Sequence, residues 1–187
     1  ESVKVVVYQP TYDYQLEREV LIRISFEDLK KLYSNEMVQA GKDSHDQPKY
    51  LAKGAAWLNH PMRRQFKGGV TFAPGKDVPK DFFNLWRGFA VKPQAGDWTL
   101  LRQHILNVIC GGDKKLYAYV IGWLARLFQK PGEQGSVALV LRGSRGTGKS
   151  TLGDLILKMV GQHGLHITHA KHLVGNFNAH LRDAVFL

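Results

Sequence analysis

Cysteine, long apolar runs and internal repeats are rare or absent in this 187-residue sequence. Cys110 is the only cysteine, so neither a disulfide framework nor a cysteine-based metal site is expected. No apolar run approaches the length of a membrane span, and the first residues carry no signal-peptide pattern. The sequence begins at Glu1 rather than methionine, which indicates a boundary inside a longer protein. We therefore expect a cytoplasmic protein without a membrane-spanning segment.

Acidic residues are also few. The sequence holds 16 Asp and Glu against 26 Lys and Arg, which gives a formal net charge of +10 and a pI of about 9.7. This balance favours a polyanionic partner, most simply nucleic acid, but does not require one. Because 44% of the residues are hydrophobic, the chain can bury one substantial core and a small second one.

A phosphate-binding motif is the most informative feature that is present. The run GSRGTGKS, from Gly143 to Ser150, fits the P-loop pattern G-x-x-x-x-G-K-[ST]. Residues 137–141 (VALVL) upstream predict a buried parallel strand. Downstream, apolar residues recur at helical spacing until Gly161. A glycine-rich turn with a coincidental lysine is the alternative, but the order strand, loop and helix favours a site for a nucleoside triphosphate.

The residue types of the motif suit phosphate chemistry. Its glycines let backbone N–H groups approach phosphate oxygens at the positive end of a helix. Lys149 is placed to reach the β- and γ-phosphates as the catalytic cation, and the Ser150 hydroxyl to bind Mg²⁺. Arg145 either touches phosphate or is solvated, and Thr151 contacts the α-phosphate side. The predicted nucleotide-binding set is Gly143, Ser144, Arg145, Gly146, Thr147, Gly148, Lys149, Ser150 and Thr151.

The acids of a complete ATPase are missing beside this motif. A P-loop ATPase needs a carboxylate at the end of a neighbouring strand for Mg²⁺, and usually a second for the attacking water. Asp154 lies about one turn into the predicted helix, where a solvent-facing role is favoured. Asp183 precedes residues 184–187, a predicted core strand, and so lies roughly 13 Å short of its carboxyl end. We expect the acidic pair after Leu187, so this stretch would bind ATP without hydrolysing it.

The first third of the chain predicts a small mixed region. Residues 3–8 and 20–26 alternate as strands do, and Ser25 to Asp28 form a capping box that would open a short helix. Residues 34–54 are polar and predict a loop or linker. Residues 57–72 interleave basic and aromatic side chains, which indicates either a nucleic-acid surface or solvated cations around core aromatics; they are Arg63, Arg64, Lys67, Trp57, Phe66 and Phe72.

Three further helices are predicted, two before the motif and one beyond the motif helix. Asp97 can cap the first, with a face of Trp98, Leu101, Ile105 and Val108. Asp113 can cap the second, which is apolar almost all round and would be clamped between layers until Pro131. Residues 165–169 predict a strand, and a third helix follows around residues 172–182, where contact of Asn176, Phe177 and Asn178 with nucleotide or DNA stays open.

Four histidines recur at every third residue after the motif helix: His163, His166, His169 and His172. This spacing raises the possibility of a metal site. Gly161 and Gly164 would break a helix, however, and a strand would point alternate side chains to opposite faces. Histidines at the surface, or in support of a neighbouring site, are therefore the default interpretation.

Several segments together resemble the helicase part of phage and plasmid primase-helicases. They are residues 83–89 (FNLWRGF), residues 123–125 (WLA) with Gln129 and Pro131 beyond them, the P-loop, and residues 175–178 (GNFN) followed by His180 and Leu181. The chain is similar over roughly residues 57–187 to this family, which belongs with the poxvirus-type primase-helicases of superfamily 3. Their AAA+ cores form rings that translocate on single-stranded DNA.

The resemblance implies a role in DNA replication in a bacterial host cell, with ATP and Mg²⁺. It also implies single-stranded DNA as a partner and a homo-oligomer, commonly a hexameric ring. Only residues 143–151 are carried over from the family as nucleotide ligands. Trp86 and Arg87 receive no functional assignment, and tight packing with a cation–π pair is expected for them. The Walker B acids, sensor residues and arginine finger of the family would follow Leu187.

The sequence therefore predicts an α/β fold with a P-loop NTPase core of the AAA+ type. Its parallel sheet would be truncated after the third core strand and preceded by a helical layer and a small mixed N-terminal region. We place the boundaries at residues 1–56, 57–130 and 131–187. Two other function classes stay open: a small-molecule P-loop kinase, which would need a substrate pocket and an arginine-bearing lid, and a non-catalytic nucleic-acid-binding module, which rests on the net charge.

Overall fold

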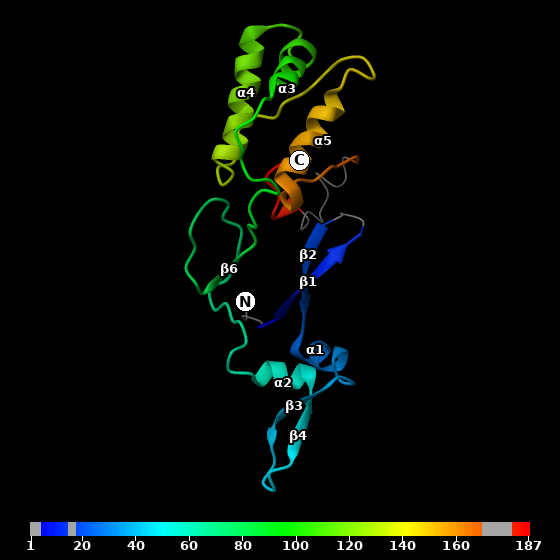
Figure 1. The fold of residues 1–187 in the computed structure, drawn as a ribbon, viewed down its shortest axis with the longest axis vertical. Coiled ribbons are helices and arrows are strands. Elements are labelled where there is room, and N and C mark those ends of the chain that lie inside the picture. Colours follow the sequence, from blue (N-terminus) through cyan, green and yellow to red (C-terminus); the bar gives the residue numbers. More distant parts are fainter. Residues whose placement is uncertain (1–4, 15–17, 170–180) are drawn as a thin grey trace. The chain divides into compact units, whose positions relative to one another are not determined.

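The chain divides into two compact units. The structure, a computed structural model, describes residues 5–14, 18–169 and 181–187. The first unit, called unit 1 below, is Glu1–Gln65, and unit 2 is Phe66–Leu187 (Figure 1). The whole predicted nucleotide-binding motif therefore lies in unit 2.

Unit 1 begins with an antiparallel hairpin and a short helix. Strands β1 (Val7–Asp13) and β2 (Arg18–Ile24) pair over their full length. Helix α1 (Phe26–Leu32) starts where the capping box predicts, because the Ser25 side chain accepts a hydrogen bond of 3.0 Å from the backbone N–H of Asp28. The Ser25 hydroxyl in turn donates to the Asp28 carboxylate at 2.7 Å. The helix prediction for this segment is confirmed.

A second hairpin corrects the prediction of a linker over residues 34–54. Strands β3 (Met37–Lys42) and β4 (Pro48–Ala52) pair antiparallel, and helix α2 (Lys53–Asn59) follows at once. The polar residues form the tight connection between the strands. The Asp43 carboxylate accepts from the backbone N–H groups of His45 and Gln47, at 2.8 and 2.9 Å, as in an Asx turn.

Unit 2 begins with a small parallel pair and irregular chain. Strands β5 (Gly69–Thr71) and β6 (Phe82–Asn84) are three residues each. The Asn84 amide group fixes the chain beyond β5, since it accepts from the backbone N–H of Ala73 at 3.0 Å and donates to the Ala73 carbonyl at 3.1 Å. This segment, residues 66–97, leads into the helices that carry the site.

Helix α3 (Thr99–Gln103) continues directly into a π-helical segment, η1 (His104–Ile109). The N-cap is Trp98, one residue after the predicted cap Asp97, whose carboxylate accepts from the backbone N–H of Thr99 at 2.9 Å. The predicted apolar face is only partly correct, because Ile105 is 1% exposed whereas Val108 is 46% exposed. The π turn accounts for this, since it breaks the 3.6-residue period.

Helix α4 (Lys114–Gln129) begins at the predicted cap. The Asp113 carboxylate accepts from the backbone N–H groups of Lys115 and Leu116, at 2.7 and 3.1 Å. The expectation that α4 is clamped between two layers is wrong for the described chain. Its only buried residue is Val120, while Leu116 and Tyr119 are each 54% exposed. One face of α4 therefore packs and the opposite face is open.

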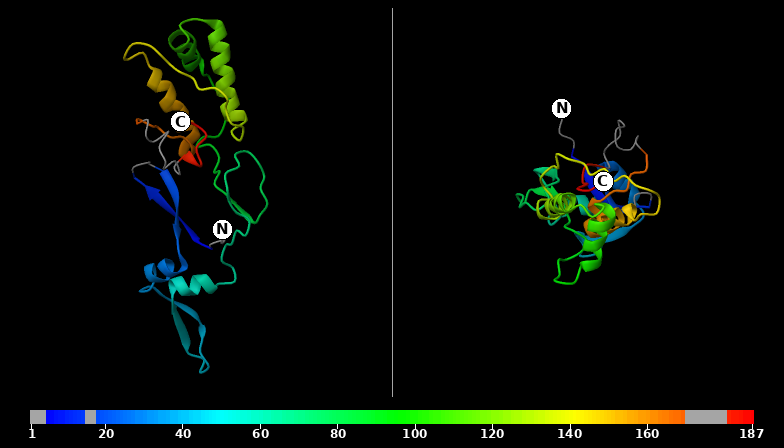
Figure 2. Two further views of the ribbon diagram at one scale, coloured as in Figure 1. Left: turned by 180° about the vertical axis from the view of Figure 1, so that it is seen from behind. Right: turned by 90° about the horizontal axis from the view of Figure 1, so that it is seen from above.

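Helix α5 (Lys149–Val160) and the short 3₁₀ turn η2 (Gly161–His163) follow the motif. Figures 1 and 2 show α3, α4 and α5 gathered in unit 2. Buried residues of η1, α4 and α5, and of the turn after η1, form one hydrophobic core: Ile105, Cys110, Val120, Leu152, Ile156 and Val160. The predicted helical layer thus packs directly on the helix that follows the P-loop.

Prediction and structure differ most in the segments that were predicted to be core strands. Residues 137–141 and 165–169 form no described strand, and residues 184–187 contribute a single parallel bridge, Gly164 to Phe186. Within that bridge the Leu165 N–H donates to the Phe186 carbonyl at 3.0 Å. A strand buried in a parallel sheet needs a partner on each edge, and Val140 in the first segment is 80% exposed. The AAA+ parallel sheet remains a prediction, and the helix expected around residues 172–182 lies almost wholly outside the described residues.

Candidate functional site

The P-loop motif forms a compact turn at the start of α5. Gly146 and Gly148 both lie in the left-handed region, with φ of 78° and 77°, and Gly148 is the residue that caps the helix. Only glycine adopts this conformation without strain, so the sequence pattern has a direct backbone reason. Helix α5 is 12 residues long and directs its unpaired first N–H groups and positive dipole end toward this turn.

The Lys149 ammonium group lies inside the turn. Its Nζ donates to the carbonyl oxygens of Gly143 at 3.1 Å and Ser144 at 2.7 Å, and to the Thr147 hydroxyl at 2.9 Å. An ammonium group has three donors, and these three acceptors engage all of them. A bound phosphate would therefore have to replace at least one loop acceptor.

The remaining predicted residues complete the turn and its rim. The Thr147 hydroxyl donates to the Ser144 carbonyl at 3.1 Å, which closes the loop on itself. Arg145, Ser150 and Thr151 are exposed. The structure therefore brings Gly143, Ser144, Thr147 and Lys149 into contact and leaves the Ser150 hydroxyl open to a ligand.

The charge of the motif region is entirely positive. Residues 142–153 contain Arg142, Arg145 and Lys149 and no carboxylate. Asp154 is exposed on α5, as the solvent-facing interpretation predicts. Among the described residues no cluster of three His, Cys, Asp or Glu could hold a metal ion. The site thus offers cations and backbone donors to an anion, while Ser150 is its one predicted metal ligand.

His104 touches the motif and was not predicted from sequence. Its Nε2 lies 3.1 Å from the Gly148 carbonyl oxygen, although 44 residues separate the two in the chain. A methyl group built on Gly148 would lie 2.5 Å from Cε1 of the His104 ring. Gly148 is therefore required both by its φ angle and by the closeness of His104. No local pattern around His104 signals this contact.

His163 is fully buried, whereas the histidines of this series were expected at the surface or in support of a neighbouring site. Its Nε2 accepts from the backbone N–H of Arg87 at 2.9 Å, and its Nδ1–H donates to the Asp183 carbonyl at 2.7 Å. The ring stacks on Trp86 with centroids 4.6 Å apart. His163 thus joins three distant segments of unit 2. His172 lies outside the described residues.

Arg87 forms a cation–π contact, but with a different ring from the expected one. Its guanidinium lies 4.7 Å from the centroid of Phe83, while Trp86 packs edge-on against Phe89 at 5.1 Å. Residues 83–89, which carry part of the family resemblance, therefore have a packing role in unit 2.

The basic and aromatic residues of 57–72 are divided between the two units, and several of the aromatic rings pack on other rings. Phe66 packs on Phe83 and Phe72 on Trp86, with centroids 4.9 and 6.2 Å apart. In unit 1, Arg63 donates to the Leu58 carbonyl at 2.5 Å. These contacts favour cations around packed aromatics over a continuous base-stacking surface.

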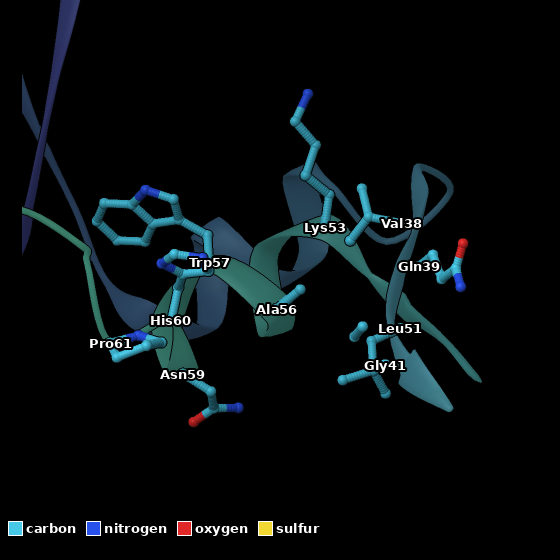
Figure 3. A pocket seen from close by; sticks show the side chains of 11 residues that line it. Val38, Gln39, Gly41, Leu51, Lys53, Ala56, Trp57, Asn59, His60 and Pro61 are labelled. Atoms are coloured by element: carbon cyan, nitrogen blue, oxygen red, sulfur yellow. The ribbon is translucent and has the colours of Figure 1, made fainter. Parts of the chain in front are cut away.

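A pocket of about 550 Å³ lies in unit 1, between α2 and the β3–β4 hairpin (Figure 3). Val38 and Leu51 of the hairpin and Ala56 and Trp57 of α2 supply its apolar lining. Lys53 is the one lysine or arginine that lines it, and its ammonium group is paired with the Glu36 carboxylate. The cation of this pocket is therefore neutralised by a carboxylate, whereas residues 142–153 contain no carboxylate to pair with Lys149.

Burial raises the pKa of the Cys110 thiol, with a smaller contribution from the Asp113 carboxylate. Cys110 is 5% exposed and belongs to the core of unit 2, where it serves packing. Among the described residues, no helix combines the length and the hydropathy that crossing a bilayer requires.

No protein-family model matches the sequence, and no curated protein matches it. The fold is similar to a solved structure, the apo form of the C-terminal region of NrS-1, residues 305–718. The TM-score is 0.59 at 21% sequence identity, over 95% of this chain and 41% of that chain. This chain therefore spans about two-fifths of the NrS-1 region and shares the fold of that part.

Proposed function

We propose that this chain is the ATP-binding part of a DNA helicase of the primase-helicase type. The observation that carries the proposal is the Lys149 ammonium group, held in a turn of left-handed glycines at the N-terminus of α5. A triphosphate is the ligand whose charge and oxygen spacing suit such a turn. The fold shared with the C-terminal region of NrS-1 and the sequence resemblance to primase-helicases support the helicase class.

The residues of the turn would divide the work of binding. Backbone N–H groups at the start of α5 would donate to phosphate oxygens, and Lys149 would exchange a loop acceptor for the β- or γ-phosphate. The Ser150 hydroxyl would ligate Mg²⁺, which neutralises phosphate charge when bound. No carboxylate lies within residues 142–153, so we expect this stretch alone to bind ATP without turnover.

Single-stranded DNA and a ring of identical subunits complete the proposal. Unit 2 carries 16 Lys and Arg against 7 Asp and Glu, an excess that suits a phosphate backbone. In a ring, a neighbouring subunit or further sequence would supply the base and the arginine that hydrolysis needs. ATP hydrolysis would then drive translocation on the strand.

The test is the affinity for ATP with Mg²⁺, measured by calorimetry. Lys149→Ala should weaken binding about 10- to 100-fold, the value of a charge-assisted hydrogen bond. Lys158→Ala is the matched control, because Lys158 is an exposed lysine in the last turn of the same helix. Equal affinity in the two variants would contradict the proposal.

Two further measurements separate the competing classes. Transfer of phosphate from ATP to a metabolite would favour a small-molecule kinase. If the affinity for single-stranded DNA changed neither when nucleotide is added nor in the Lys149→Ala variant, a non-catalytic nucleic-acid-binding module would be favoured.

A further inference from the structure

The π-helical segment η1 brings a side chain from outside the motif onto the P-loop. His104 is the first residue of η1 and is half-buried, with its Nε2 3.1 Å from the Gly148 carbonyl oxygen. A carbonyl only accepts, so Nε2 must carry the proton and donate it. The nearest approach of the ring to Gly148 leaves no room for a Cβ atom there.

The position of His104 is fixed by its neighbour in sequence. Ile105 is 1% exposed and packs in one core with Leu152 and Ile156 of α5. The π turn is closed by the Cys110 N–H, which donates to the Ile105 carbonyl at 2.9 Å. Because Ile105 is held against the same helix that the P-loop opens, His104 meets Gly148 at a set distance.

The hydrogen bond determines where the next amide points. In a planar trans peptide the C=O of one residue and the N–H of the next point in opposite directions. No peptide bond among the described residues is cis. When His104 holds the Gly148 carbonyl on its own side, the Lys149 N–H must point the other way, away from His104. That amide is one of the unpaired donors at the start of α5.

We infer that His104 is a positioning residue for the nucleotide site, which orients the Gly148–Lys149 peptide so that its N–H is ready for a phosphate oxygen. The inference rests on the proposed function and adds a residue that the motif does not contain. His104 acts through the peptide and makes no contact with the nucleotide itself. Without it, only the first hydrogen bond of α5, which the Gly148 carbonyl accepts as the N-cap, would hold this peptide, and each binding event would have to order it further.

Two substitutions test this role against a merely structural one. His104→Leu removes the donor without adding bulk, and His104→Gln places an amide N–H near the position of Nε2. We expect His104→Leu to weaken ATP and ADP binding about five-fold, the value of one hydrogen bond, and His104→Gln to restore it to within two-fold of the unmodified chain. Thermal unfolding of the three proteins should agree, which separates positioning from loss of fold.

The outcomes are distinguishable from those of the proposed function. If Lys149→Ala abolishes binding while His104→Leu binds as the unmodified chain does, only the role of His104 is overturned. If the unmodified chain binds no ATP, both the proposed function and the role of His104 are overturned. A nucleotide-free check uses ¹⁵N NMR of the imidazole, which should show a proton on Nε2. A proton found only on Nδ1 would overturn the inference whatever the nucleotide data show.

Discussion

The two units of this chain differ in charge and in the way they are held together. Unit 1 has 10 Lys and Arg against 9 Asp and Glu, whereas unit 2 has 16 against 7. In the described part of unit 1, Leu29 is the one buried large apolar residue. Unit 2 has a core of six buried residues drawn from η1, α4, α5 and the turn between the first two.

This difference separates local from long-range structure. Unit 1 is built from two hairpins and two short helices, and its strand pairs join residues close in sequence. Unit 2 joins residues far apart, as in the bonds of His163 to Arg87 and to Asp183. The proposed nucleotide site belongs to the second kind, since His104 and Gly148 meet although 44 residues separate them. Substitutions in unit 2 should therefore lower the free energy of unfolding by more than those in unit 1, and should affect residues farther away in the sequence.

The largest effect is expected for His163→Leu. Leucine would leave the Arg87 N–H and the Asp183 carbonyl in a buried place without their ring partner. Each such loss costs about 1–3 kcal/mol, so we expect unit 2 to lose about 3 kcal/mol of unfolding free energy. This loss of stability can be measured as the rate at which a thiol reagent labels Cys110 in mild denaturant. Cys110 is the only cysteine and is buried, so the reagent reaches it when unit 2 opens.

His166→Leu is the control for this prediction, because His166 is exposed three residues away. It should leave the labelling rate of Cys110 unchanged. Equal rates for the two variants would show that His163 does not join the segments of unit 2, and the contrast between the units would lose its main support.

Local signals predicted where α1 and α4 begin, but α2 was not predicted. Ser25 and Asp113 cap α1 and α4 as expected, because a capping side chain and its N–H partners lie within three residues. The hairpin of β3 and β4 was missed because Asp43 and its polar neighbours are typical of loops. Apolar residues on both sides of this polar stretch, such as Val38 and Leu51, which pair in the hairpin, were the signal that could have revealed it.

Strands and tertiary contacts were harder to predict. Residues 137–141 have the composition of a strand, but a strand exists only with a partner, and composition does not supply one. The glycine turn and the helix after it, α5, could be predicted because the glycines, the lysine and the helical pattern are contiguous in the sequence. His104 could not be predicted, since its role depends on a core that places η1 beside α5.

An intermediate effect is expected in unit 1 for Gly54→Ala. The new Cβ would lie 2.7 Å from the Leu29 carbonyl oxygen and 3.0 Å from the Lys30 Cα, so α1 and α2 would have to separate. Overpacking of this kind costs about 1–3 kcal/mol. Hydrogen exchange should accelerate in α1 and α2, while the labelling rate of Cys110 in unit 2 stays the same.

Gly122→Ala is the matched helical glycine in unit 2. It is exposed on α4 with open space around it, so alanine should stabilise the helix by up to about 1 kcal/mol. If Gly54→Ala also accelerated the labelling of Cys110, the two units would unfold together and the comparison would have to be abandoned.

The smallest effect concerns the ion pair of Lys53 and Glu36 in unit 1. The hydrogen bond and the charge of the Glu36 carboxylate raise the pKa of Lys53 above its ordinary 10.5, although both side chains are about half exposed. Because the pKa is raised on folding, the pair stabilises below pH 10.5 and its contribution is lost as the pH rises through the folded pKa. Glu36→Gln should therefore lower the melting temperature slightly at neutral pH and not at all at high pH. Added salt should shrink the difference, since water and ions screen an exposed pair, and a difference that persisted at high pH would mean that Glu36 acts through packing instead.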